Sequence, residues 1–135
     1  MFDEMTNFTT YAERARREGH LDLAKRIETE GRICSRLVKH ALASGYTVSV
    51  NDSEEWTVIK STSYREIMEA LFTTDQDTLL FRDADGNRLG TVLLVYGNDG
   101  YDVMADMSGP NDAALEAFCE WLKPVEKYAD QFEPA

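Results

Sequence analysis

Residues 46–60, YTVSVNDSEEWTVIK, change the hydrophobic period of the chain. Tyr and Val alternate with Thr and Ser in the first five of these residues, a polar turn follows at 51–55, and an apolar run returns at 56–60. A period of two residues on both sides of an acidic turn is typical of paired strands. The stretch therefore predicts a β-hairpin.

The segment before this hairpin, residues 1–45, follows a helical period instead. Thr10 and Glu13 have the spacing of a capping box and predict a helix that begins near residue 11. A second helix follows a Gly-His pair, with Gly31 as a position where it could kink and Gly45 as the residue that ends it. Its apolar stripe contains Leu23, Ile27, Cys34, Val38 and Ala41.

The segment after the hairpin predicts one more helix and then three strands. Ser63 and Glu66 form a second capping box, and the apolar residues that follow recur at the spacing of one buried helix face. These residues are Tyr64, Ile67, Met68, Leu71 and Phe72. Strands are predicted at 78–82, 89–96 and 101–107, because tight turns that contain Asp-Gly separate them.

The last strands and the final helix also carry positional signals. The run 92–95 is apolar on both faces, which favours a central strand covered on two sides. Asp102 and Asp106 alternate with apolar residues, so the last strand is expected near an edge of the sheet. Pro110 opens a final helix, and Pro124 is expected to break or kink it.

Together these elements predict an α+β fold in the order ααββαβββα. The sheet is expected to have five mostly antiparallel strands, with the helices packed on it and an N-terminal helical pair covering its other face or an edge. The length suits one domain, 1–135, made of a helical segment, 1–45, and an acidic α+β body, 46–135.

A crossover helix after Ser63 would have a consequence for the acidic turns. The second and third strands would then run parallel, and the turn 52–55 would lie at the same end of the sheet as Asp99. Asp83 and Asp85 would lie at the opposite end. Topology alone would therefore gather carboxylates at one end.

Charge is distributed unevenly along the chain. Residues 1–45 contain eight Lys and Arg against seven Asp and Glu, whereas residues 46–135 contain six against eighteen, which gives the net charge of −11. Such a body repels polyanions and attracts basic partners. No apolar run reaches the roughly 20 residues that a bilayer requires, and the N-terminus does not look like a signal peptide, so a cytoplasmic location without a membrane is expected.

This charge favours a non-enzymatic module that binds a basic protein. Carboxylates on turns and an edge strand could imitate the phosphates of a duplex and occupy the nucleic-acid groove of a host protein. Acidity that serves only solubility explains the same composition. The residues expected to form the partner-binding surface are Asp52, Glu54, Glu55, Asp99, Asp102 and Asp106.

Two alternative functions remain open. The clustered carboxylates could serve an enzyme that depends on a divalent metal, but residues 89–122 contain no Lys or Arg to hold a phosphate. Nucleic acid could bind a basic surface on the N-terminal helices, although interleaved Glu residues favour ordinary salt bridges. That basic surface consists of Arg26, Arg32, Arg36 and Lys39.

Motifs for cofactors and catalysis are missing from the sequence. The loop 83–87 begins like a calcium loop, but Arg88 and Leu94 occupy the positions that require Gly and Glu, so a hairpin turn is favoured. Cys34 and Cys119 lie on apolar helix stripes and are expected to be reduced, buried thiols. We therefore expect no cofactor and no metal, and the oligomeric state stays open because a second copy could pair with the last strand or the long helix.

Two stretches, 45–56 and 94–98, together with Lys60-Ser61-Thr62, resemble small uncharacterised acidic proteins of phages and other mobile elements. The resemblance covers roughly residues 38–108 and implies no activity and no functional residue. It does imply a small accessory protein that binds a host component, as inhibitors of host defence systems do, several of which are acidic mimics of nucleic acid.

Overall fold

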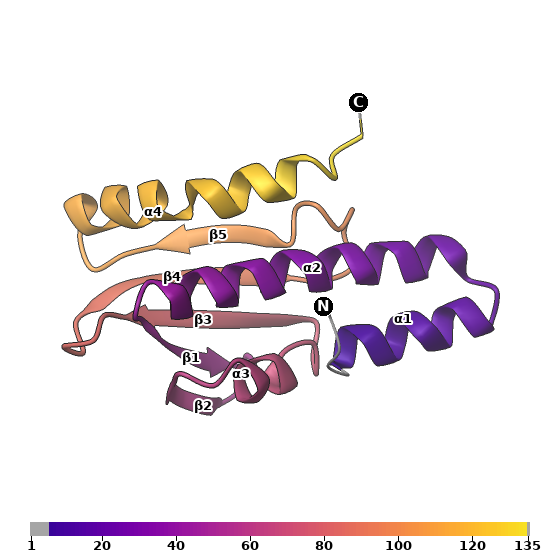
Figure 1. Cartoon of the computed structure of the whole chain (residues 1–135), viewed down its shortest axis with the longest axis horizontal. Helices are drawn as coiled ribbons and strands as arrows, with labels where there is room; N and C mark the ends of the chain where they lie inside the picture. Colours follow the sequence, from indigo (N-terminus) through magenta and orange to yellow (C-terminus); the bar gives the residue numbers. More distant parts are fainter. Residues whose placement is uncertain (1–5, 135) are drawn as a thin grey trace.

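The computed structural model describes residues 6–134, which form an α+β fold with four helices and a five-stranded antiparallel sheet (Figure 1). The order ααββαβββα is the one predicted. The elements are α1 (Asn7–Arg17), α2 (Leu21–Ala43), β1 (Thr47–Asn51), β2 (Trp56–Ser61), α3 (Tyr64–Ala70), β3 (Gln76–Arg82), β4 (Arg88–Val95), β5 (Met104–Ser108) and α4 (Asp112–Asp130). No helix within 6–134 combines the length and the apolar character needed to cross a membrane.

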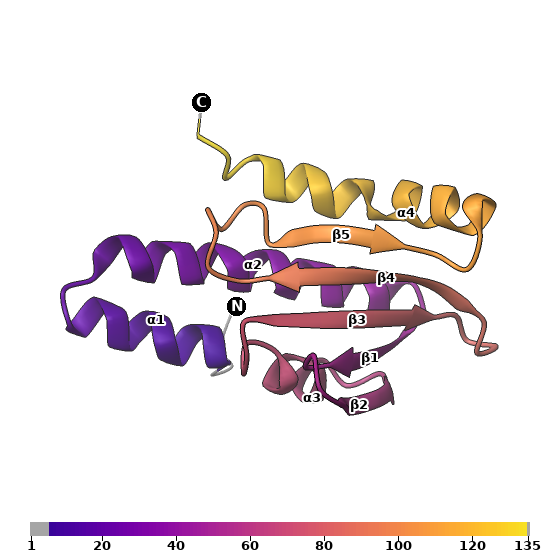
Figure 2. The same cartoon turned by 180° about the vertical axis from the view of Figure 1, so that it is seen from behind.

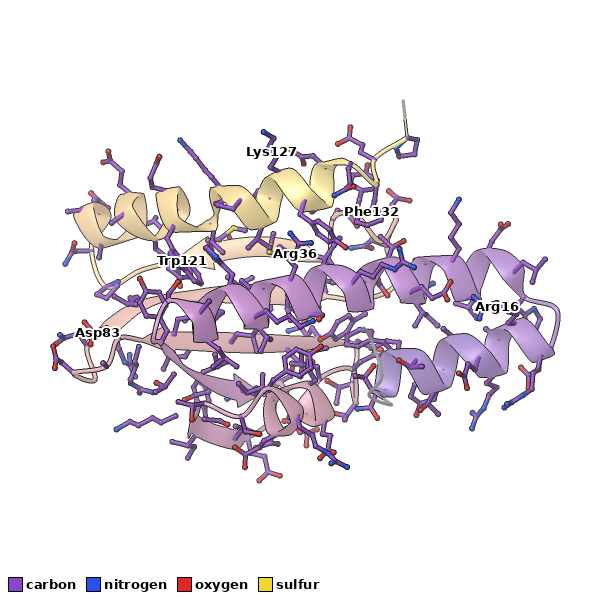
Figure 3. The ribbon with its side chains drawn as sticks, in the orientation of Figure 1. Arg16, Arg36, Asp83, Trp121, Lys127 and Phe132 are labelled. Carbon is purple, nitrogen blue, oxygen red and sulfur yellow. The ribbon has the colours of Figure 1, made fainter. Side chains whose placement is uncertain are left out.

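The strands lie in the order β2-β1-β3-β4-β5, and every neighbouring pair is antiparallel. Because β2 and β3 both pair with β1, they run parallel to each other, as predicted. The register pairs Asn51 with Thr78 and Gln76 with Val95, so the β1–β2 turn and the β4–β5 loop lie at the same end of the sheet. Asp83, in the β3–β4 turn, lies at the opposite end (Figure 3).

The helices cover only one face of the sheet. In Figure 1, α2 crosses in front of the strands between α3 and α4, and Figure 2 shows the opposite face without a helix. The prediction that the N-terminal pair covers the other face or an edge is therefore wrong. Ile33, Leu37 and Val38 of α2 are fully buried in the same core as the apolar side chains of α3 and α4, and α1 packs on α2 beyond the ends of the strands.

The one-sided arrangement also corrects the prediction for β4. Val92 and Leu94 are fully buried under the helices. Thr91 and Leu93 point to the opposite face, which no helix covers and which we call the bare face, and they are only half-buried. Apolar side chains on both sides of a strand therefore do not require a cover on both sides. The expectation that the last strand lies at an edge is confirmed, because β5 pairs only with β4.

The predicted helix ends are partly confirmed. The Ser63 side chain accepts a hydrogen bond from the Glu66 N–H at 3.2 Å, and Gly45 adopts a φ of +81° after α2. In contrast, α1 begins one turn earlier than predicted, because the Thr6 hydroxyl accepts from the Thr9 N–H.

Neither Gly31, where a kink was possible, nor Pro124, where a break or kink was expected, ends its helix. Gly31 lies inside the continuous α2, where a Cβ atom would lie 2.8 Å from Phe8 Cβ, so glycine allows α1 to pack closely. Pro124 lies inside α4, which continues to Asp130 because Val125 and Ala129 remain buried after the proline. The α4 N-cap is Asn111, just after the predicted opening at Pro110.

Candidate functional site

Three loops meet at one end of the sheet, and we call them the acidic end. They are 52–55 between β1 and β2, 73–75 before β3, and 97–102 between β4 and β5. They contain six carboxylates and no Lys, Arg or His. The carboxylates belong to Asp52, Glu54, Glu55, Asp75, Asp99 and Asp102. The structure thus brings five of the six predicted residues to one end and adds Asp75, which sequence reasoning missed.

The carboxylates of the acidic end divide into two kinds. Asp52 accepts hydrogen bonds from the Glu54 and Glu55 N–H groups, both at 3.0 Å, and these bonds lower the pKa of the Asp52 carboxyl. Asp102 accepts from the Asp99 N–H at 3.2 Å. Asp52 and Asp102 therefore shape their loops. The carboxylates of Glu54, Glu55 and Asp99 make no hydrogen bond or ion pair with any described residue and remain exposed.

Hydrogen bonds join the first two loops of the acidic end to each other and attach the second loop to the end of β4. The Thr74 hydroxyl donates to the Asp52 carbonyl at 3.1 Å, which joins the first loop to the second. The Tyr96 N–H donates to the Asp75 carbonyl at 3.0 Å, which joins the second loop to the end of β4. The exposed carboxylates therefore lie on a framework that is already ordered.

Two buried carboxylates support this framework from inside. Asp77 accepts from the Tyr96 hydroxyl at 2.6 Å and from the Phe72 N–H at 3.0 Å, and Glu30 of α2 accepts from the Gly97 N–H at 2.9 Å. Both side chains are fully buried, and each keeps one oxygen without a hydrogen bond in the described chain. Burial raises the pKa of both carboxyl groups.

The cysteines follow the prediction in part. Cys34 is fully buried, and burial, reinforced by the nearby Glu30 and Asp77 carboxylates, raises the pKa of its thiol well above the ordinary value. A thiol held in its neutral form is a poor nucleophile. Cys119 is also free but only half-buried.

Asp106 lies apart from the acidic end. It pairs with Leu93 on β5, and its carboxylate accepts from the N–H of Met107 at 2.9 Å. From Leu93, the pairing of neighbouring strands leads across the bare face to Asn51 of β1 and from there to Trp56 of β2. The Trp56 side chain is 44% exposed. Trp56 therefore places an exposed aromatic ring directly after the acidic turn.

The carboxylates do not converge on a metal site. Within residues 6–134, no group of three or more His, Cys, Asp or Glu could hold a metal ion. Asp83 serves its own turn instead: its carboxylate accepts from the Asp85 and Asn87 N–H groups and from the Asn87 side chain. The bonds from Asn87 contribute most to lowering the pKa of the Asp83 carboxyl. The loop 83–87 is thus a turn, as predicted.

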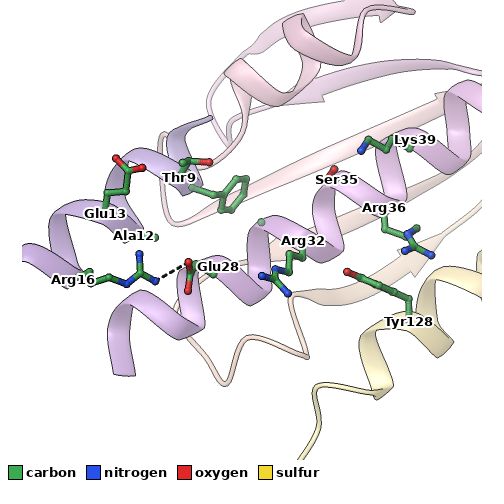
Figure 4. Close-up of a pocket in the computed structure, with 12 residues that line it drawn as sticks. Thr9, Ala12, Glu13, Arg16, Glu28, Arg32, Ser35, Arg36, Lys39 and Tyr128 are labelled. Atoms are coloured by element: carbon green, nitrogen blue, oxygen red, sulfur yellow. Dashed lines mark ion pairs between the residues drawn. The ribbon is translucent and has the colours of Figure 1, made fainter. Parts of the chain in front are cut away.

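The predicted basic surface is divided. The Arg26 Nε lies 3.6 Å from a Glu30 oxygen, and the Arg26 side chain is mostly covered. Arg32, Arg36 and Lys39 lie together on an exposed stripe of α2. They line a pocket of about 430 Å³ between α1, α2 and the second half of α4 (Figure 4).

Two contacts organise the side chains of this pocket. Arg16 of α1, which is not one of the four residues of the predicted basic surface, forms an ion pair with Glu28 at 2.7 Å. The Arg36 guanidinium carbon lies 3.9 Å from the centre of the Tyr128 ring on α4. Arg16 could not have been assigned from sequence, because its neighbourhood depends on how three helices pack.

Comparison with known proteins adds no further constraint. No protein-family model, no curated protein and no solved structure matches this chain. The resemblance to proteins of mobile elements stays a prediction.

Proposed function

We propose that this protein is a non-enzymatic module that binds a basic protein through its acidic end. One observation supports this proposal above others. Three ordered loops at the same end of one sheet carry six carboxylates and contain no cationic residue. The cations that border them belong to the neighbouring helices: Arg26 of α2 lies against Gly100, and Arg14 of α1 lines a hollow with Asp75. A surface of this kind matches a positively charged partner and excludes acidic ones.

The electrostatics favour fast and selective association. The net charge of −11 attracts a basic partner over a distance, and the unpaired carboxylates of Glu54, Glu55 and Asp99 are available for contacts. Asp77 and Glu30 fix the loops from inside. Because the loops are already ordered, binding loses little conformational entropy.

Trp56 provides an apolar anchor beside these charges. Its surface is 44% exposed, and it directly follows Glu55 in the chain. Tryptophan is enriched among the residues that dominate binding energy at protein interfaces. A basic partner with an apolar hollow would therefore bind more tightly than a uniformly charged one.

The partner class we favour is a protein with a nucleic-acid groove. The first and third loops of the acidic end are attached to β1 and β4, which are two strand intervals, or roughly 10 Å, apart. This separation is comparable with the roughly 12 Å width of a DNA major groove. Two loops attached at that separation could present their carboxylates to cations that normally bind phosphates on two strands.

A labelled oligo-arginine peptide tests whether the acidic end is the preferred site for a basic ligand. Fluorescence anisotropy at low salt would compare the protein with a variant that carries Glu54→Lys, Glu55→Lys and Asp99→Lys. We expect the variant to bind at least about tenfold more weakly, because the steering charge and the contact charge are both reversed. These three positions leave the loop-shaping Asp52 and Asp102 intact.

The matched control reverses the same number of charges elsewhere. Asp85→Lys, Glu116→Lys and Glu120→Lys lie in the opposite turn and on the exposed row of α4. The control is expected to retain most of the affinity. Equal weakening in both variants would show that peptide binding depends only on net charge, and the proposal would fail.

A further inference from the structure

We propose that the pocket between α1, α2 and α4 binds a small phosphorylated molecule. This site shares no residue with the acidic end, so the inference is independent of the proposed function. The pocket has about 430 Å³, which lies within the range of small-molecule sites.

The charge of the pocket opposes the charge of the whole protein. Four cationic side chains and two carboxylates line it, in a chain with a net charge of −11. The Glu28 carboxylate is already paired with Arg16. Arg32, Arg36 and Lys39 therefore exceed the remaining carboxylate, Glu13, and leave the pocket positive.

Arg36 has the geometry of a prepared anion donor. Its guanidinium lies over the Tyr128 ring, with 3.9 Å from the guanidinium carbon to the ring centre. Stacking of this kind restricts the flexible side chain while its in-plane N–H groups stay available. Such a fork binds a phosphate with two parallel hydrogen bonds.

Arg32 supplies a second donor one helical turn away. It is exposed and has no hydrogen-bond or ion-pair partner anywhere in residues 6–134. Arg32 and Arg36 leave successive turns of α2 on the side that faces α4 (Figure 4). Side chains at this spacing are neighbours on a helix surface, so two adjacent anionic groups could bind them together.

The other end of the pocket has an apolar floor with charged groups beside it. Phe8, Ala12 and Gly31 form this floor where α1 packs on α2, and Glu13 and the Arg16–Glu28 ion pair lie at the same end (Figure 4). A ligand with phosphates at one end and an uncharged ring at the other matches this division, and a nucleotide is of that class. A long nucleic acid fits less well, because the acidic body around the pocket would repel its backbone.

Calorimetry on the full chain at low salt tests this site, with pyrophosphate and ATP as the probes. Pyrophosphate tests binding to the cationic side chains alone. ATP carries phosphates as well and adds an uncharged ring that can lie against the apolar floor of the pocket. We expect saturable binding of both, with ATP the tighter ligand. The double variant Arg32→Gln/Arg36→Gln should bind at least about tenfold more weakly, because both phosphate donors are lost.

A charge-matched control separates the site from general attraction. Arg17→Gln/Lys25→Gln removes two exposed cations of α1 and α2 that lie outside the pocket, and it should bind as the native protein does. A further variant, Arg36→Lys, keeps the charge and the fold but loses the planar fork, so it should bind several-fold more weakly.

Three results would overturn the proposal. The first is no binding of either probe at millimolar concentration, and the second is equal weakening in the pocket variant and its control. The third is binding of a short DNA duplex, lost in the pocket variant, without binding of pyrophosphate or ATP. That result would assign the basic stripe to nucleic acid instead of a small molecule.

Discussion

Gly31 is the residue that permits the close packing of α1 on α2. In an ordinary helix interior, Gly→Ala stabilises by roughly 1 kcal/mol. Here the new Cβ would lie 2.8 Å from Phe8 Cβ, inside a packed contact. We predict that Gly31→Ala destabilises the protein by about 1–3 kcal/mol, measured by urea unfolding. Lys25→Ala, on the exposed side of α2, should change stability little, and a gain from Gly31→Ala would contradict this account.

Glu30 makes the stability of the protein depend on pH. Because burial raises its pKa in the folded state, its contribution is fully present below the ordinary value of 4.5 and is lost as the pH rises through the folded value. We predict that Glu30→Gln gains stability relative to the native chain between pH 5 and pH 8. Denaturant unfolding at both pH values measures this difference.

The matched control for Glu30 is Glu116→Gln, which removes an exposed carboxylate of α4. Its stability relative to the native chain should change far less between the two pH values. Comparing differences is necessary because burial also raises the pKa of the Asp77 carboxyl, whose contribution to stability is likewise lost as the pH rises through its folded value. The burial argument for Glu30 would be wrong if its variant showed no pH-dependent difference.

At the scale of elements, Ser63 determines where α3 begins. Its hydroxyl accepts from the Glu66 N–H at 3.2 Å, and α3 is only 7 residues long. We predict that Ser63→Ala costs about 1 kcal/mol of unfolding free energy, measured by thermal or urea unfolding. Thr62→Ala, one residue earlier and exposed, is the control. Equal effects of the two changes would show that the cap does not stabilise α3.

The elements that were predictable from sequence are those with local signals. The change of period at residue 46, the Ser63 cap and the Asp-Gly turns depend on neighbours in the chain, and all are present in the structure. The start of α1 has a local signal as well, the Thr6 cap, but it also depends on a distant contact. Asn7 donates a hydrogen bond from its side chain to the Leu71 carbonyl at 2.7 Å, which no sequence pattern indicates.

The face of the sheet on which α2 packs was not predictable from sequence, for a related reason. The stripe of α2 predicts which side of the helix is buried, but it does not indicate which side of the sheet receives it. Pro124 shows the same limit, because tertiary burial of Val125 and Ala129 maintains a helix that local rules would end. Packing thus overrides local preference at both places.

For the whole molecule, topology predicted more of the candidate site than composition did. The parallel direction of β2 and β3 gathers Asp52, Glu54, Glu55, Asp99 and Asp102 at one end, as the strand order had suggested. Asp106 does not belong there, because strand alternation places it on the bare face. The basic pocket was missed because it forms only when three separate helices come together.

The most direct test of the central claim is capture of a binding partner from a bacterial lysate. The native chain, the acidic-end variant and its charge-matched control would be immobilised at low and at high salt, and captured proteins identified by mass spectrometry. We predict that the native chain and the control capture the same basic nucleic-acid-binding protein, that high salt or added DNA releases it, and that the acidic-end variant does not capture it. Capture of that protein by all three chains, or of none by any, would contradict the account.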